Sequence, residues 1–292
     1  MPLDLDSFPM VLFQASQERA WVAATIDYSK EAEHWQALSD DERDFFGRLI
    51  AGFRVGERGV THELAPLAAV LRDEKRLDEE MYVTAQLFEE ARHVEFFERW
   101  LDAALPGVWG RDLPYPELRG DLFGAKLPAV MRALVSDPSP EAQLRAVILY
   151  HFYVEGIGAE AAYPLYFAIF EKTGMFPAMA EGIQLIRRDE ARHIAFGTYL
   201  LQRLLAEHPQ LEAVFESEME IIESYIDLAG EETFAPFEGR PTPFGLDPDD
   251  YRGLYRENYE LQRRNVFSRE LPKAAGSQGE VQAIQESPRL TA

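Results

Sequence analysis

The sequence predicts an all-α protein whose core is a bundle of four long helices, with additional helices around it. Four long segments place apolar residues every three or four positions, which is the period of an amphipathic helix. Two of these segments contain nearly the same phrase, EEARH at 89–93 and DEARH at 189–193. Each of the other two places one glutamate, Glu57 or Glu155, on its apolar face. The doubled phrase indicates a duplicated helix pair rather than a short-period repeat.

Local signals fix the elements of the first half of the chain. Residues 1–37 are expected to be irregular, with aromatic side chains folded onto the body. Ser39 and Glu42 form a capping box that starts the first long helix, and Pro66 bends or ends it. The second long helix is expected from Leu77 to Ala104.

A loop rich in glycine and proline follows at 106–116. Ser139 can cap the third long helix, with Pro140 at its first position, and this helix is expected to end near Lys172. The fourth long helix is expected at Phe176–Glu207. Shorter helices are expected at Leu127–Val135, Leu211–Gly230 and Tyr251–Asn265.

Composition narrows the class of protein. The 292 residues are expected to form one helical domain at 1–270, with its bundle core at about 39–230, and a disordered tail at 271–292. A net charge of -22 argues against nucleic-acid binding, and the absence of cysteine excludes disulfides and sulfur-ligated clusters. The first ten residues lack a basic signal-peptide region, and no apolar run approaches the ~20 residues of a membrane span. A cytoplasmic protein is therefore expected.

The doubled phrase also predicts a metal site. Each copy contains Glu-x-x-His, and residues three apart on a helix share a face. Two such pairs plus one glutamate from each of two other helices is the ligand set of ferritin-like dinuclear carboxylate proteins. Four buried carboxylates need counter-charges, which two divalent cations supply, and oxygen-rich ligation with one imidazole per metal suits iron or manganese. The candidate ligands are Glu57, Glu90, His93, Glu155, Glu190 and His193.

Simpler interpretations exist for single residues. One Glu-x-x-His alone is more often a surface glutamate beside a packed histidine, and Glu89 with Arg92 can form a surface ion pair. Asp189 can accept a proton from a ligand imidazole or pair with Arg192, and both alternatives stay open. The histidines without a partner pattern are interpreted as structural; they are His34, His62, His151 and His208.

Four segments together resemble the ligand-binding oxidases related to the ribonucleotide reductase small subunit. They are GERGV at 56–60, EEARH at 89–93, YHFYVEG at 150–156 and DEARH at 189–193, and the resemblance extends from about Ser39 to Gly230. It implies a homodimer that activates dioxygen at a manganese/iron centre. Manganese is then expected with Glu57, Glu90 and His93, and iron with Glu155, Glu190 and His193; a di-iron pair satisfies the same ligands.

The resemblance further implies a long-chain fatty acid in an apolar tunnel, placed near Gly158–Ala162, and an ether cross-link between the Val60 Cβ and the Tyr150 oxygen. In an ideal helix, Tyr150 is rotated about 140° from Glu155, so its approach to the metals needs a local distortion or relies on its length. Arg58 departs from the family pattern directly after Glu57. Gly59 follows it and can loosen the helix there, with an effect on the ligand pocket that the sequence leaves open.

Two other functions share the ligand set. One is a radical-generating ribonucleotide reductase small subunit. Phe97, four residues after His93, takes the place of the tyrosine in tyrosyl-radical members, which leaves the manganese/iron subclass. The other is iron storage in a ferritin-like cage, which the chain length and the helices after Glu207 disfavour.

Overall fold

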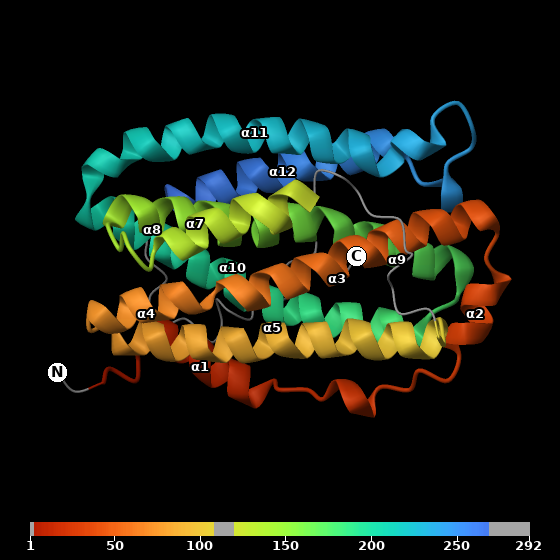
Figure 1. Cartoon of the computed structure of the whole chain (residues 1–292), viewed down its shortest axis with the longest axis horizontal. Coiled ribbons are helices and arrows are strands. Elements are labelled where there is room, and N and C mark those ends of the chain that lie inside the picture. The colour runs from red at the N-terminus through yellow and green to blue at the C-terminus, as the bar shows by residue number, and fades with distance from the viewer. Residues whose placement is uncertain (1–2, 108–119, 269–292) are drawn as a thin grey trace.

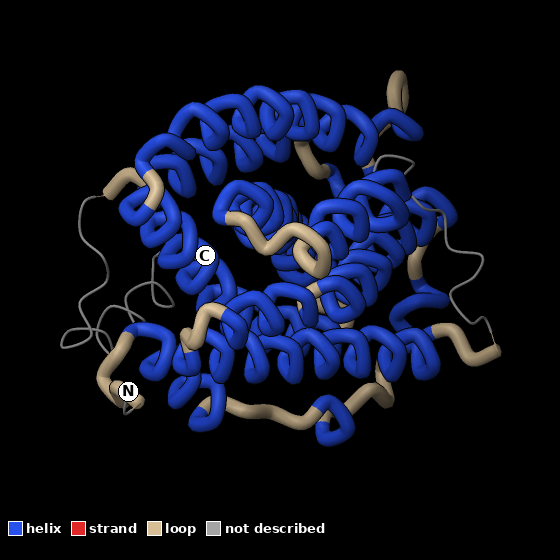
Figure 2. Tube along the Cα trace, turned by 60° about the vertical axis from the view of Figure 1, so that its left-hand side comes forward, coloured by secondary structure: helices blue, strands red, loops and turns tan. Residues whose placement is uncertain are grey.

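The structure is a computed structural model that describes residues 3–107 and 120–268. Every regular element in these two ranges is helical, and none is a strand (Figure 2). The expected all-α fold is confirmed. None of the helices in these ranges is long and apolar enough to cross a bilayer.

Four long helical rods, called lines below, run side by side along the long axis (Figure 1). Three of these lines are single helices, and one is a continuous run of three helical segments. The capping box of Ser39 and Glu42 starts α3, as expected, and α5 has the expected bounds. The third line is continuous but consists of three pieces, α8, the π-helical segment η3, and α9. The four lines are α3 (Asp40–Glu63), α5 (Leu77–Ala104), α8–η3–α9 (Pro140–Val147, Ile148–Ala159, Glu160–Thr173) and α10 (Pro177–Glu207).

Shorter elements cover the bundle. Helix α1 lies along α5 on one side, and α11 with α12 lies on the opposite side (Figure 1). Pro66 lies in the first turn of α4, so it separates α4 from α3. The covering elements are α1 (Phe8–Glu18), η1 (Ala23–Thr25), α2 (Glu31–Ala37), α4 (Ala65–Asp73), η2 (Leu122–Lys126), α7 (Leu127–Ala133), η4 (Pro209–Leu211), α11 (Glu212–Phe234), η5 (Ala235–Phe237), η6 (Pro243–Gly245) and α12 (Pro248–Val266).

The expectation of an irregular segment at 1–37 was wrong, because α1 and α2 lie within it. Tertiary contacts stabilise these short helices. Phe8 and Leu12 of α1 are buried in the core. From α2, Glu31 accepts hydrogen bonds from the Trp100 indole and from the backbone N–H of Ala178, in the first turn of α10. The expected loop at 106–116 and the tail at 271–292 lie mostly or wholly outside the described residues.

The π-helical segment η3 explains how Tyr150 reaches the candidate metal site, although an ideal α-helix would turn it about 140° away from Glu155. Backbone hydrogen bonds in a π-helix join residues five apart, so such residues stack on nearly the same face. Tyr150 and Glu155 are five apart within η3, and both are buried. The Tyr150 hydroxyl donates to Glu90 Oε1 at 3.2 Å, so the wider turns bring it to the same centre as Glu155.

A buried ion-pair cluster connects α5 to α10 away from this centre. Glu79 is 2% exposed, lies 3.2 Å from Arg203 and accepts a hydrogen bond from the Tyr199 hydroxyl. Burial raises the pKa of Glu79 to about 7, although the cations of Arg203 and Arg76 oppose this change.

This raised pKa predicts a pH-dependent stability. The folded chain binds the Glu79 proton more tightly than the unfolded chain, so the contribution is complete below pH 4.5 and is lost as the pH rises through about 7. Relative to Glu79→Gln, wild-type stability should fall by on the order of 1 kcal/mol per pH unit across this window. Urea unfolding of both proteins at several pH values measures the difference. A pH-independent difference would contradict the prediction.

Candidate metal centre

Six buried side chains from the four long lines meet at one point inside the bundle. Glu57 comes from α3, Glu155 from η3, and the two Glu-x-x-His pairs come from α5 and α10. Their ligand atoms form two groups in which all atoms lie within 4.8 Å of one another. The first group is Glu57, Glu90, His93 and Glu190; the second is Glu90, Glu155 and His193.

Glu90 and Glu190 lie between the two imidazoles. The Nδ1 atom of His193 is 3.3 Å from one oxygen of Glu90, and the Nδ1 atom of His93 is 3.5 Å from the other. Glu190 has the same arrangement, with one oxygen 3.4 Å from His93 and the other 3.5 Å from His193. Each carboxylate therefore lies within reach of both imidazoles. Glu90 belongs to both ligand groups, whereas Glu190, which was expected with Glu155 and His193, belongs to the first group.

The chemistry of these donors fits a pair of cations. Among the described residues, four atoms at the centre are buried without a hydrogen-bond partner: one oxygen each of Glu90, Glu155 and Glu190, and the Nδ1 atom of His193. Burial raises the pKa of Glu57 to about 8, and burial together with Glu190 raises the pKa of Glu155 well above its usual range. Two divalent cations would displace these protons and satisfy the unpaired atoms.

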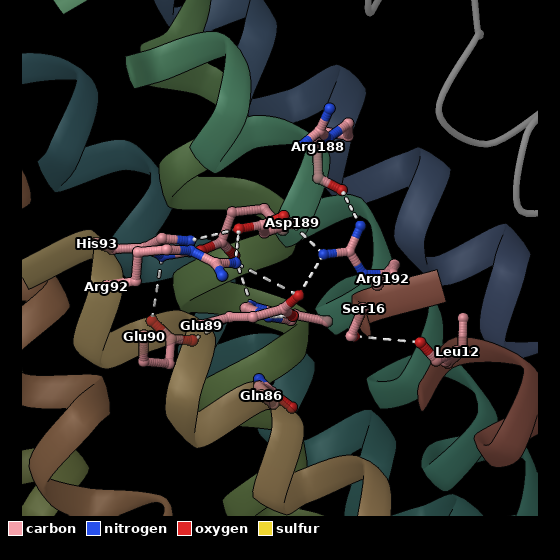
Figure 3. A network of polar contacts seen from close by, with 12 residues as sticks. Leu12, Ser16, Gln86, Glu89, Glu90, Arg92, His93, Arg188, Asp189 and Arg192 are labelled. Atoms are coloured by element: carbon pink, nitrogen blue, oxygen red, sulfur yellow. Dashed lines mark hydrogen bonds and ion pairs between the residues drawn. The ribbon is translucent and has the colours of Figure 1, made fainter. Parts of the chain in front are cut away.

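The imidazoles are oriented by a crossed pair of acids. The Nε2 atom of His193 is 2.9 Å from Glu89. Glu89 directly precedes Glu90 in the motif at 89–93, on α5. In the same way, His93 Nε2 is 3.3 Å from Asp189 (Figure 3). Each acid thus contacts the histidine of the opposite helix, leaving both Nδ1 atoms turned to the centre. Such contacts fix the tautomer and the ring orientation of a ligand histidine.

Two arginines neutralise these acids (Figure 3). Arg192 donates to Glu89 and, at 2.6 Å, to Asp189; Arg92 also donates to Asp189 at 2.6 Å. The interpretation of Glu89 and Arg92 as a surface ion pair was wrong, because both are buried. Asp189 fulfils both of its open alternatives, since it contacts an imidazole and pairs with Arg192. Burial acts to raise the pKa of Asp189, but the hydrogen bond with His93 and the charges of Arg192 and Arg92 lower it.

Trp21 was not recognised from the sequence as part of this region. Its indole donates to Asp189 Oδ2 at 2.7 Å, and the Arg92 guanidinium lies over its ring. Trp21 lies just before η1, 168 residues from Asp189. No local pattern indicates this contact, because it depends on how the N-terminal segment folds across α5 and α10.

A cavity adjoins the centre on the side of α3 and η3. Val60 lines it together with Glu57, Glu155 and Glu190. Gly158 and Ala159 line it as expected, whereas Ala161 and Ala162 are buried in the core and are not among its lining residues. Its other lining residues are Gly52, Phe53, Gly56, Leu122, Phe123, Tyr153, Val154, Ala229, Glu232, Thr233 and Tyr255.

The Phe123 ring packs over two glycines of α3 where this cavity is lined. A Cβ atom at Gly59 would lie 2.9 Å from Phe123, and one at Gly56 would lie 3.3 Å from it. Gly59 therefore lets η2 approach α3 closely. Arg58 points away to an ion-pair distance of 3.5 Å from Glu98, and it is not among the cavity-lining residues.

Comparison with known proteins identifies the family. The model of the ribonucleotide reductase small chain matches residues 10–232. The chain belongs to this family. Solved structures of an R2-like ligand-binding oxidase are also similar. One, with an aerobically reconstituted Mn/Fe cofactor, has a TM-score of 0.85 and 29% identity over 90% of this chain and 94% of that chain. Another, described as taken after photoconversion, has the same score and identity over 92% and 96%.

Membership of the small-chain family confirms the resemblance inferred from the four motifs. It also agrees with the helical bundle and with the carboxylate and histidine cluster found in the described residues. In this small-chain protein, Phe97 is fully buried against Phe53 and Phe96. An apolar ring thus occupies the position one turn after His93.

Proposed function

We propose that this chain is an oxygen-activating oxidase with one manganese and one iron ion held by the six converging side chains. The observation that carries the proposal is the pair of buried ligand groups with two glutamates between them. The similar oxidases contain an Mn/Fe cofactor, which supports the choice of metals. A homodimer in the cytoplasm and a di-iron variant of the centre belong to the same proposal.

The six residues have distinct roles in this proposal. Glu57 and His93 would hold manganese, and Glu155 and His193 would hold iron. Glu90 and Glu190 would serve as the remaining carboxylate ligands, since each contacts both imidazoles. When bound, the metals supply the redox capacity to reduce dioxygen. The protein keeps both imidazoles oriented through Glu89 and Asp189 and excludes water by burying all six ligands.

An ether cross-link between Val60 and Tyr150 is part of the proposal. Val60 is 4% exposed and lines the cavity beside Glu57, and the fully buried Tyr150 hydroxyl contacts Glu90. Forming the bond from Val60 Cβ to the Tyr150 oxygen removes one hydrogen from each. Two protons and two electrons leave the side chains, and dioxygen accepts the electrons.

The cavity is the proposed site of a long-chain fatty acid or a similar apolar carboxylate. Three candidate metal ligands, Glu57, Glu155 and Glu190, line this cavity, so a ligand carboxylate in it would be able to reach metals bound there. Phe53, Leu122 and Phe123 supply apolar walls for a hydrocarbon chain.

Mass spectrometry after aerobic loading with manganese(II) and iron(II) tests the cross-link. Cleavage after arginine and lysine gives separate peptides at 59–72 and 146–172, which contain Val60 and Tyr150 respectively. We expect one joined species that is lighter than the sum by about two hydrogen atoms.

Two controls accompany this measurement. Tyr150→Phe removes the phenolic oxygen and should give unlinked peptides, and so should wild-type protein loaded without oxygen. Unlinked peptides from fully metal-loaded, aerobically treated wild type would refute the cross-link. Lipid extraction of the purified protein, followed by mass spectrometry, checks for the carboxylate ligand in the same sample.

A radical-generating subunit of ribonucleotide reductase is the second candidate. The contact of Trp21 with Asp189, and of Asp189 with His93, favours it because it joins a redox-active indole to the candidate centre through two contacts. The decisive measurement is ribonucleotide reduction after mixing with a catalytic large subunit. Turnover in that mixture, without a cross-link, would favour this candidate over the oxidase.

A further inference from the structure

We propose that Gln86 and His151 are positioning residues that fix the orientation of the Glu155 carboxylate. Gln86 donates to one oxygen of Glu155, and His151 contacts the amide oxygen of Gln86. The inference rests on the proposed function only in requiring that the six side chains bind metal; the identity of the substrate does not enter it.

Gln86 is fully buried on α5, one turn before Glu90 (Figure 3). Its amide nitrogen donates to Glu155 Oε1 at 3.0 Å across the interior of the bundle. The second oxygen, Oε2, is buried without a hydrogen-bond partner among the described residues. Oε1 also lies 3.7 Å from the Nδ1 atom of His193, so the hydrogen bond from Gln86 fixes the position of a Glu155 oxygen that faces the candidate centre.

His151 fixes which way the Gln86 amide points. The Nε2 atom of His151 lies 3.3 Å from Gln86 Oε1, and an amide oxygen only accepts hydrogen bonds. His151 must therefore carry its hydrogen on Nε2. Burial lowers the pKa of His151 to about 3, which agrees with a neutral ring. A flipped amide would bring its oxygen to the Glu155 carboxylate. It would also require the hydrogen of His151 to lie on Nδ1, which is buried without a hydrogen-bond partner among the described residues.

The backbone on both sides holds His151 in place. A Cβ atom on Gly197 of α10 would lie 2.2 Å from the His151 Cβ, so the ring fits only because this position is glycine. On its own side, His151 lies in η3 with Glu155 four residues later. A chain of contacts, called the relay below, thus leads from Gly197 of α10 through His151 and Gln86 to Glu155. The side chains of His151, Gln86 and Glu155 are all buried.

The expected consequence is a selective loss of metal binding when the relay is cut. Outer partners of metal ligands typically contribute about 10–100-fold to metal affinity. Gln86→Leu keeps an apolar body of similar size and removes the donor. We expect one of two bound manganese(II) equivalents to weaken by about tenfold or more, while the other changes little.

The probe is manganese(II) titrated into full-length apoprotein, with free ion followed by electron paramagnetic resonance. Gln143→Leu is the matched control. Gln143 is also a buried glutamine that donates to a glutamate, at 2.7 Å from Glu74, but it lies on α8 outside both ligand groups. This control should lower the free energy of unfolding without changing either binding step.

A pair of substitutions at His151 separates positioning from packing. His151→Gln keeps an N–H donor near the place of Nε2, whereas His151→Phe keeps the ring and removes the donor. If His151 positions Gln86, the glutamine variant should retain both manganese equivalents and the phenylalanine variant should weaken one. If His151 only fills space, the phenylalanine variant should bind as well as wild type.

Three results would overturn the inference or its basis. Unchanged binding in Gln86→Leu would refute the role of Gln86. Full binding in His151→Phe with a loss in His151→Gln would refute the role of His151. Wild-type protein that binds no manganese(II) would instead refute the proposed function, and the inference with it. The controls keep these results distinct.

Discussion

Glu90→Ala is expected to abolish the binding of both metals, whereas Glu57→Ala should abolish only one. The reason is that Glu90 belongs to both ligand groups, and its two oxygens lie 3.3 and 3.5 Å from the Nδ1 atoms of His193 and His93. Glu57 belongs to the first group alone. Loss of a ligand should exceed the roughly 100-fold upper range found for outer partners.

Metal content measured by elemental mass spectrometry after gel filtration checks this difference. Glu95→Ala is the matched control, because Glu95 lies on the same helix but is exposed and pairs with Arg99. It should retain both metals. A Glu90→Ala protein that keeps one metal at wild-type affinity would show that Glu90 serves a single site.

The long helices could be predicted from the sequence because their signals are local. The capping box at Ser39 and the apolar period of 77–104 each depend only on neighbouring residues, and the structure has both. The convergence of the two Glu-x-x-His pairs could also be inferred, because a buried carboxylate needs a partner and a doubled motif supplies two. The helices α1 and α2 were missed because contacts with α5 and α10 stabilise them, and these contacts are absent from the local pattern.

The surroundings of the centre depend on how distant helices meet. Nothing in either phrase indicates that Glu89 contacts His193, or that Asp189 contacts His93, since each contact joins residues about 100 positions apart. Periodicity at 3.6 residues also misplaced Tyr150, because it does not foresee the π-helical segment. The same reasoning left His151 as a structural residue, although it contacts a partner of Glu155.

Among the arginines of the described residues, Arg192 is expected to give the largest loss of stability when it is replaced, as in Arg192→Met. The Arg192 side chain is fully buried and donates to both Glu89 and Asp189. Methionine keeps much of the apolar volume but leaves two buried acids with Arg92 as their remaining cation. Breaking a buried ion pair from one side typically costs about 3–5 kcal/mol.

Urea unfolding of the apoprotein measures this loss, with Arg99→Ala as the control. Arg99 is 45% exposed and pairs with Glu95, so its removal should change stability by less than about 0.5 kcal/mol. A loss below about 1 kcal/mol in Arg192→Met would mean that Glu89 and Asp189 do not depend on Arg192 as a counter-charge. Because Glu89 and Asp189 contact His193 and His93, Arg192→Met should also weaken metal binding. Intact stability together with intact metal binding would contradict the role assigned to the arginine pair.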